Sequence, residues 1–257
     1  MTFTRCNNRA KTRSQMTRHR ESKNQEASSE LPEKHIGNLS NLLINENFLL
    51  TCNESTSQVE KLIQDVNKNG FVITYFHQVK SFKTMKLTID ARRIQDTPNA
   101  GGSSIESEAL SFEILKKFFN AELLKTEMEV VYFPEGGSIT DYVIRIFNKV
   151  IGVSVTRAMK KNFELYTIED ADNLLRKKLK GILQSSRNSL VKWHKQILHV
   201  WAFDENCVDS LLIAWSELNY ELKSNTVLII TVANKSKEVF VNQAPKIKKK
   251  KLIKNIF

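Results

Sequence analysis

Residues 106–119 read ESEALSFEILKKFF, residues 138–148 read SITDYVIRIFN, and residues 149–159 read KVIGVSVTRAM. The first stretch has the acidic start and the apolar spacing of a helix, whereas the other two have the composition and alternation of strands. MEVVYFP at 128–134 predicts a further strand between the helix and the other two. The predicted core of the fold is therefore a helix followed by a three-stranded meander.

The chain continues with two helix-and-strand units. TIEDADNLLRKKLKGILQSSRNS (167–189) and NCVDSLLIAWSELNYELKS (206–224) predict helices, and KWHKQILHVWAF (192–203) and NTVLIITVA (225–233) predict strands. A helix followed by an apolar strand, twice in succession, is typical of α/β packing. NTVLIITVA is almost continuously apolar, which predicts a strand that is covered on both faces.

The sequence before the meander is mixed in pattern. HIGNLSNLLINENFLL (35–50) predicts a short helix or a helix pair, and STSQVEKLIQDVNKNG (55–70) predicts a helix that Ser55 or Ser57 caps and Gly70 ends. FVITYFHQV (71–79) and KTMKLTIDA (83–91) predict strands. QDTPNAGGSS (95–104) predicts a linker. This part of the chain is either a small independent module or an elaboration of the main domain.

The predicted organisation has five parts: a disordered basic arm (1–30), a small α+β region (31–94), a linker (95–104), the main domain (105–242) and a Lys-rich tail (243–257). The net charge of +11 divides into +4 for residues 1–30, +6 for residues 246–257 and +1 for the rest. Basic ends suit contacts with nucleic-acid phosphates or a nuclear import receptor, and Lys248, Lys249, Lys250 and Lys251 are the candidates. The alternative is a tail that only keeps the protein in solution.

Bulk properties exclude several classes of protein. No run of about 18 apolar residues is present, so a membrane partner is not expected. The basic N-terminus lacks the apolar core of a secretory signal. Cys6, Cys52 and Cys207 are too few and too far apart for a disulfide scaffold or a structural zinc site. We expect a nuclear or cytoplasmic protein in a reducing compartment.

The order helix, three-stranded meander, helix, strand resembles the core of the PD-(D/E)XK nuclease superfamily, the restriction-endonuclease-like fold. The resemblance covers roughly residues 104–234, and GVSVTRAM, EDADNLLRKKLKGI and KQILHVWAF are similar to a divergent eukaryotic group of unassigned role. It implies an α/β fold with a mixed sheet flanked by helices. It also implies a Mg²⁺ site made by a helical glutamate, an aspartate on the second strand and an acid on the third, with a lysine two positions later.

On this resemblance, Asp141 takes the place of the second-strand aspartate, because it follows a Gly-Gly-Ser turn and opens an apolar strand. Glu108 takes the place of the helical glutamate, with Glu106 and Glu113 as rivals. Carboxylates are the hard oxygen ligands that Mg²⁺ prefers. The alternatives are a strand-edge aspartate that binds turn amides and glutamates that are simply solvated.

The third strand departs from the family pattern. Ser154 stands in the place of the acid and Thr156 in the place of the lysine, and Arg157 is expected on the opposite face. The lysine has either moved onto the following helix, where Lys178 is the first choice, or been lost from a decayed site. A helix whose basic face is only solvated is the alternative for Lys178.

The strand at 192–203 carries other polar candidates. Gln196 could face a water at a metal site, and His194 could contact a phosphate. Histidines in buried strands are more often hydrogen-bonded core residues than catalysts, and that expectation covers His199 as well.

The first functional hypothesis is Mg²⁺-dependent hydrolysis of phosphodiester bonds in DNA, with RNA as the second choice. Glu108 and Asp141 would hold the metal, Ser154 or Thr156 would position a water or a phosphate oxygen, and Lys178 would assist the nucleophile. The second hypothesis is an inactive module of the same fold that binds nucleic acid or a protein partner. The third is an unrelated α/β interaction protein.

Overall fold

A mixed eight-stranded sheet organises the chain in the computed structural model, which describes residues 41–100, 104–161, 164–233 and 236–241. The chain divides into two compact units, of which the first, Met1–His35, lies outside the described residues. In the second unit the main elements are β1 (Leu42–Ile44), β2 (Phe48–Cys52), α1 (Thr56–Gln64), β3 (Gly70–Gln78), α2 (Ile89–Asp96), α3 (Ile105–Phe119), β4 (Glu122–Thr126), β5 (Tyr142–Ile146), β6 (Lys149–Ala158), α4 (Ile168–Asn188), β7 (Lys195–Ala202), α5 (Glu205–Glu217), α6 (Tyr220–Lys223) and β8 (Thr226–Val232).

The strand order is β1-β2-β3-β8-β7-β6-β5-β4. β6, β7, β8 and β3 run parallel, and antiparallel pairs complete the sheet at both ends. Every residue of β7 and β8 is buried, as the apolar run of β8 predicts. The predicted class, a mixed α/β fold, is confirmed.

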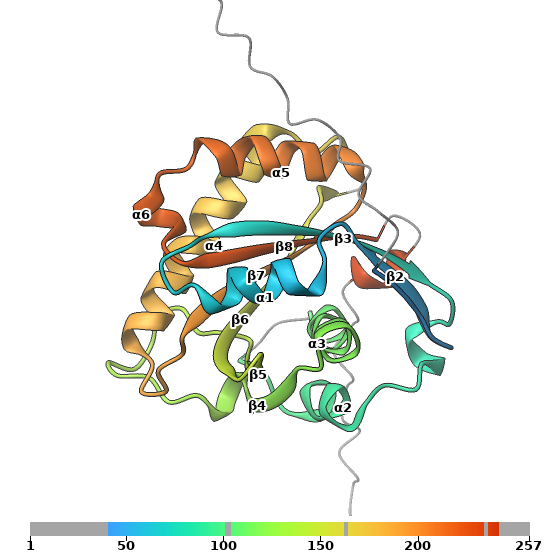
Figure 1. Cartoon of the computed structure of the whole chain (residues 1–257), viewed down its shortest axis with the longest axis horizontal. Helices are drawn as coiled ribbons and strands as arrows, with labels where there is room; N and C mark the ends of the chain where they lie inside the picture. The colour runs from blue at the N-terminus through green and yellow to red at the C-terminus, as the bar shows by residue number, and fades with distance from the viewer. Residues whose placement is uncertain (1–40, 101–103, 162–163, 234–235, 242–257) are drawn as a thin grey trace, which may run out of the picture. The chain divides into compact units, whose positions relative to one another are not determined.

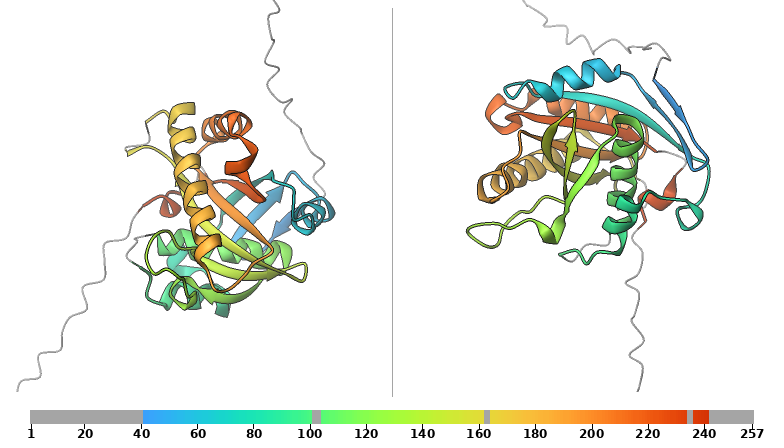
Figure 2. Two further views of the ribbon diagram at one scale, coloured as in Figure 1. Left: turned by 90° about the vertical axis from the view of Figure 1, so that its left-hand side faces the viewer. Right: turned by 60° about the horizontal axis from the view of Figure 1, so that its bottom comes forward.

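Helices cover both faces of the sheet (Figure 1, Figure 2). α1, α2 and α3 pack on one face in a cluster that includes Phe112, Tyr142 and Trp201. α4 and α5 pack on the other face, where Leu175 and Leu179 meet the side chains of β7 and β8. Consecutive residues of β6 alternate between these faces, so odd-numbered positions face α3 and even-numbered positions face α4.

A chain of polar side chains crosses the core. His199 Nδ1 lies 2.5 Å from the Ser111 hydroxyl, which lies 2.5 Å from the Tyr142 hydroxyl. On the other side, His199 Nε2 lies 2.7 Å from the hydroxyl of Thr231, and that oxygen lies 2.7 Å from the hydroxyl of Thr74. Burial lowers the pKa of His199 to about 3, so the imidazole is neutral. The expectation that His199 is a hydrogen-bonded core residue is confirmed.

The N-terminal part of the second unit belongs to the main sheet, which answers the alternative that the sequence left open. β3 runs parallel to β8, from the Gly70–Val227 pair to the Tyr75–Val232 pair, and β2 and β1 extend the same sheet. The segment 31–94 is thus an elaboration of the main domain within its described residues. No independent module begins at the predicted linker, where α2 ends at Asp96.

Four predicted elements differ in the structure. Residues 42–52 form β1 and β2 rather than helices, because β2 pairs with β3 and β1 pairs with β2. KTMKLTIDA forms a 3₁₀ turn (Phe82–Thr84) and the start of α2, which Thr88 caps by accepting a hydrogen bond from the Ala91 N–H. MEVVYFP follows β4 as a 3₁₀ turn (Glu127–Glu129) and irregular chain. α1 ends at Gln64 rather than at Gly70, which opens β3.

Within the described residues, no helix has the length and apolar character that crossing a membrane requires.

Candidate functional site

The site lies at the edge of β6 beyond its pair with Tyr142, the first residue of β5. The antiparallel pairing of the two strands runs from Ile146–Lys149 to Tyr142–Val153 and goes no further. β6 extends to Ala158, and β7 pairs with it on its other side. From Val155 onward, the groups of β6 that face the β5 side therefore need partners other than a strand.

Two charged side chains supply those partners for Val155. Oδ2 of Asp141 accepts a hydrogen bond of 2.5 Å from the Val155 N–H. The ammonium of Lys178 on α4 donates a hydrogen bond of 3.3 Å to the Val155 carbonyl oxygen. Asp141 and Lys178 therefore meet at the same residue of β6, although 37 positions separate them in the printed sequence.

Glu108, in the first turn of α3, completes the group. We call Glu108, Asp141 and Lys178 the carboxylate corner. Glu108 is 6% exposed, and its Oε1 accepts a hydrogen bond of 2.5 Å from the Ser104 hydroxyl. Ser104 is the N-cap of α3, yet its hydroxyl makes no hydrogen bond to the helix backbone. The usual capping interaction is thus replaced by one that orients Glu108. Such a departure from a local rule is common at functional sites.

The electrostatics of the corner show that its charges interact. Burial first, and then the charge of Glu108, raise the pKa of Asp141 to about 7, against the opposing effect of Lys178. Burial also raises the pKa of Glu108, and Lys178 and Arg157 act in the opposite direction. A buried carboxylate whose pKa a second carboxylate raises in this way is held at an energetic cost, which a cation would offset.

Glu108 and Asp141 present oxygen atoms of the kind that the implied Mg²⁺ prefers. Among the described residues, hydrogen bonds engage Oδ2 of Asp141 and Oε1 of Glu108, so each carboxylate has a second oxygen for another ligand. The described ranges contain no group of three or more His, Cys, Asp or Glu residues that could hold a metal ion. Mg²⁺ often binds to only one or two carboxylates and keeps several water ligands, so it does not need a site made entirely of protein groups. Glu108 and Asp141 fit this mode of binding.

Ser154 and Thr156 lie on β6 on either side of Val155. The pairing of β6 with β5 ends at Val153, and Ser154, the next residue of β6, is buried. Both hydroxyl residues are on the face that α4 covers, and Thr156 is partly exposed. The structure thus brings the two residues beside the corner, with no carboxylate at the position of Ser154.

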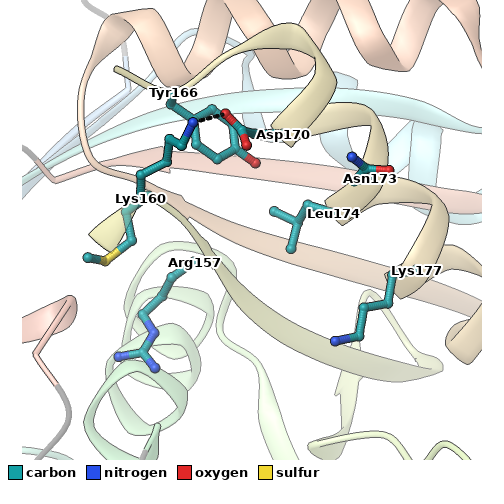
Figure 3. Close-up of a pocket in the computed structure, with 8 residues that line it drawn as sticks. Arg157, Lys160, Tyr166, Asp170, Asn173, Leu174 and Lys177 are labelled. Carbon is teal, nitrogen blue, oxygen red and sulfur yellow. Dashed lines mark ion pairs between the residues drawn. The ribbon is translucent and has the colours of Figure 1, made fainter. Parts of the chain in front are cut away.

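Arg157 leaves β6 on the side of α3, as its position in the strand predicts (Figure 3). Its Nη1 donates a hydrogen bond of 3.5 Å to the Val239 carbonyl oxygen. Burial lowers its pKa, and the charge of Glu108 opposes that shift. Arg157 therefore lies within electrostatic reach of the carboxylate corner. Lys248, Lys249, Lys250 and Lys251 lie outside the described residues.

Other candidates are occupied elsewhere. Glu113 is fully buried and accepts hydrogen bonds from the N–H and the hydroxyl of Thr88, so it supports the start of α2. His194 is 3.1 Å from the Gln64 carbonyl oxygen near the end of α1. Gln196 contacts Ser186 of α4 and lies against Gly152. Glu106 lines a different pocket, together with residues of α2.

Glu127 is a site residue that the sequence did not reveal. Its charge contributes to the raised pKa values of both Glu108 and Asp141. It belongs to the 3₁₀ turn after β4, and Oε2 accepts a hydrogen bond of 2.6 Å from the Ala100 N–H. Because MEVVYFP resembles a strand, its pattern does not place the preceding glutamate near the start of β5.

Comparisons with known proteins give two similarities. The chain is 38% identical over 196 residues to the AAC-rich mRNA clone AAC4 protein of Dictyostelium discoideum; the match covers 72% of this chain and 28% of that protein. The chain therefore spans little more than a quarter of the length of this relative. Among solved structures, Pyrococcus furiosus SfsA in complex with Ca²⁺ matches 52% of this chain and 67% of that chain, with 16% identity and a TM-score of 0.24. No protein-family model matches the chain.

Proposed function

We propose that this protein hydrolyses phosphodiester bonds in nucleic acid, with DNA preferred to RNA, and that Glu108 and Asp141 hold Mg²⁺ for the reaction. One observation carries the proposal. Two carboxylates, on α3 and at the start of β5, come together with Lys178 at the unpaired edge of β6. The arrangement combines a place for a hard cation with a basic group next to it.

Each side chain has a part in this proposal. When bound, Mg²⁺ would neutralise charge on the scissile phosphate and make a water molecule more acidic. Ser104 and the Val155 N–H orient Glu108 and Asp141, which reduces the reorganisation needed when substrate binds. Lys178 would hold the attacking water and stabilise negative charge that develops on the phosphoryl oxygens. The Thr156 or Ser154 hydroxyl would position that water or a phosphate oxygen.

The first test is a cleavage assay of the full chain on plasmid DNA, single-stranded DNA and RNA, with and without Mg²⁺. We expect wild type to cut only with the metal, and Asp141→Ala to lower the rate by about 100-fold or more. Lys178→Met should lower it by at least about tenfold. Asp209→Ala and Lys180→Met, which change exposed groups on α5 and α4, are the matched controls and should cut like wild type. Equal cutting by wild type and Asp141→Ala would contradict the proposal.

A second candidate function is nucleic-acid binding without hydrolysis. The observation that favours it is Ser154 on β6, next to Val155, where the resemblance implies an acid. In this case neither wild type nor Asp141→Ala cuts with Mg²⁺ or Mn²⁺, whereas deletion of residues 243–257 abolishes DNA retention. The tail would supply salt-sensitive affinity for the phosphate backbone. Nuclear import through the tail is tested separately, by fusing residues 245–257 to a reporter protein.

A further inference from the structure

A pocket lies beside the carboxylate corner, between the end of β6 and α4 (Figure 3). Its volume is about 270 Å³, and its lining residues are Arg157, Met159, Lys160, Tyr166, Asp170, Asn173, Leu174 and Lys177. This volume is slightly below the roughly 300–1,000 Å³ that is usual for small-molecule sites. The pocket therefore suits one small, partly apolar group rather than the width of a duplex.

The charges of the pocket favour an anion. Arg157, Lys160 and Lys177 are cationic and Asp170 is anionic, which leaves a net charge of +2 on the lining. Lys160 forms an ion pair of 3.2 Å with Asp170, so the single carboxylate is already compensated. Lys177 enters from α4, whereas Arg157 leaves β6 on the side of α3. The ammonium of Lys177 is therefore the cation on the α4 side of the pocket that can bind a phosphate group.

The remaining lining is suited to a base. Leu174 and Met159 supply apolar surface, and Asn173, exposed on α4, carries both a donor and an acceptor. Tyr166 is 5% exposed, and its buried hydroxyl has no hydrogen-bond partner among the described residues. An unpartnered buried hydroxyl in the wall of a pocket is unusual, and a polar ligand could supply its partner.

The pocket and the corner are neighbours along the same strand. Val155, which Asp141 and Lys178 hold, and Arg157 are two residues apart on β6, or roughly 7 Å. On α4, Lys178 belongs to the corner and Lys177 to the pocket. A nucleic-acid strand whose phosphate backbone crosses the carboxylate corner would thus bring the adjoining nucleotide to the pocket.

We propose that this pocket receives one unstacked nucleotide of a single strand, with its phosphate at Lys177 and its base against Leu174 beside the Asn173 amide. The inference rests on the proposed function and names its substrate as single-stranded or locally unpaired nucleic acid. Bases that must be contacted individually have to leave the stack, which costs least when the strand is already unpaired.

The test is equilibrium binding of the full chain in EDTA, where hydrolysis plays no part. The probes are a labelled single-stranded DNA, its duplex, a strand of the same length with abasic sites, and a free mononucleotide. We expect the duplex and the abasic strand to bind at least about fivefold more weakly than the single strand. Lys177→Met and Asn173→Ala should weaken single-strand binding by a similar factor. Lys180→Met, a change one helical turn further on, should not.

Equal affinity for the single strand and the abasic strand, or for the single strand and the duplex, would overturn the proposal. A mononucleotide that binds as tightly as the strand would replace it with a site for free nucleotides. The result is independent of catalysis: a protein that selects the single strand but never cuts would contradict the proposed hydrolysis and leave the pocket assignment standing.

Discussion

At the scale of single residues, the hydrogen bond between Asp141 and the Val155 N–H has a structural part, the acceptor, and an electrostatic part, the negative charge. The Val155 N–H needs an acceptor because β5 ends before reaching it, and Asp141 provides one. An asparagine side chain offers the same acceptor without the charge. The requirement for an acceptor and the requirement for a negative charge can therefore be tested independently at residue 141.

We predict that Asp141→Asn retains or increases stability. The folded-state pKa of Asp141 is raised from 3.8 to about 7, so the folded protein binds more protons than the unfolded chain between these pH values, and stability falls as pH rises through that window. An asparagine at residue 141 does not ionise, so the variant does not lose this stability as pH rises. Urea unfolding at pH 8 should show a gain of up to about 4 kcal/mol over wild type, which vanishes near pH 4.

The same variant should lose any stabilisation that Mg²⁺ gives to wild type, because one of the two proposed ligand carboxylates is gone. A variant that is clearly less stable than wild type at pH 8 would show that the charge of Asp141 serves the fold rather than a ligand.

His199 should give the opposite pH dependence. Its pKa falls from 6.5 in the unfolded chain to about 3, so the unfolded chain binds more protons, and stability falls as pH drops from about 6.5 towards 3. The slope is at most about 1.4 kcal/mol per pH unit. We expect His199→Gln to be less stable than wild type at pH 7 and the difference to shrink as pH falls to 4. A constant difference across this range would show that His199 does not titrate as burial predicts.

At the scale of elements, the turn that leads into β5 positions Asp141. Gly136 and Gly137 have φ values of +87° and +88°, which are unfavourable for other residues. A Cβ on Gly136 would meet no atom within 4 Å, whereas one on Gly137 would lie 2.6 Å from Gln184, whose Oε1 accepts a hydrogen bond from the Ser138 N–H. The two neighbouring glycines therefore differ only in their surroundings.

We predict that Gly136→Ala costs about 1 kcal/mol of unfolding free energy, from the backbone alone. Gly137→Ala should cost about 1 kcal/mol more, since Gln184 has to move and its hydrogen bond to Ser138 is disturbed. Chemical denaturation of both variants measures the difference, and equal costs would show that the turn does not depend on α4.

The elements that could be predicted from sequence are those that local interactions determine. α1 is capped by Ser55, one of the two caps that its sequence allows, and α4 begins at a capping box of Thr167 and Asp170. β1 and β2 were predicted as helices because their strand conformation depends on β3, which follows later in the chain. Local pattern does not contain that information.

The candidate site divides in the same way. Asp141 and Glu108 could be chosen because a turn and a helix start are visible in sequence. Lys178 stands among several basic residues, and only the course of α4 past the free edge of β6 distinguishes it. Glu127 depends on the path of the chain after β4, for which the sequence predicts the wrong element.

At the scale of the whole molecule, the sheet connects the N-terminal strands to the core. β3 pairs with β8 over six residue pairs, and its side chains Val72 and Phe76 belong to the same cluster as α3. A fragment of residues 105–242 would expose that edge of β8 and the part of the cluster that the N-terminal side chains cover.

We therefore predict that residues 36–241 unfold in one cooperative transition and that residues 105–242 alone do not fold. Thermal unfolding followed by circular dichroism, with amide hydrogen exchange, would compare the two fragments. A cooperative transition of the shorter fragment would show that β1–β3 are dispensable to the core.

The polar chain from Tyr142 to Thr74 has a consequence for where hydrogens lie. The Ile230 carbonyl oxygen, 3.5 Å from the Thr74 hydroxyl, can only accept a hydrogen bond. The Thr74 hydroxyl therefore donates to it and accepts a hydrogen bond from the Thr231 hydroxyl. Thr231 must then accept from Nε2 of His199, and Nδ1 accepts from Ser111 in turn. One carbonyl beside β3 thus selects the Nε2–H tautomer of His199 and orients every hydroxyl as far as β5, where the carboxylate corner begins.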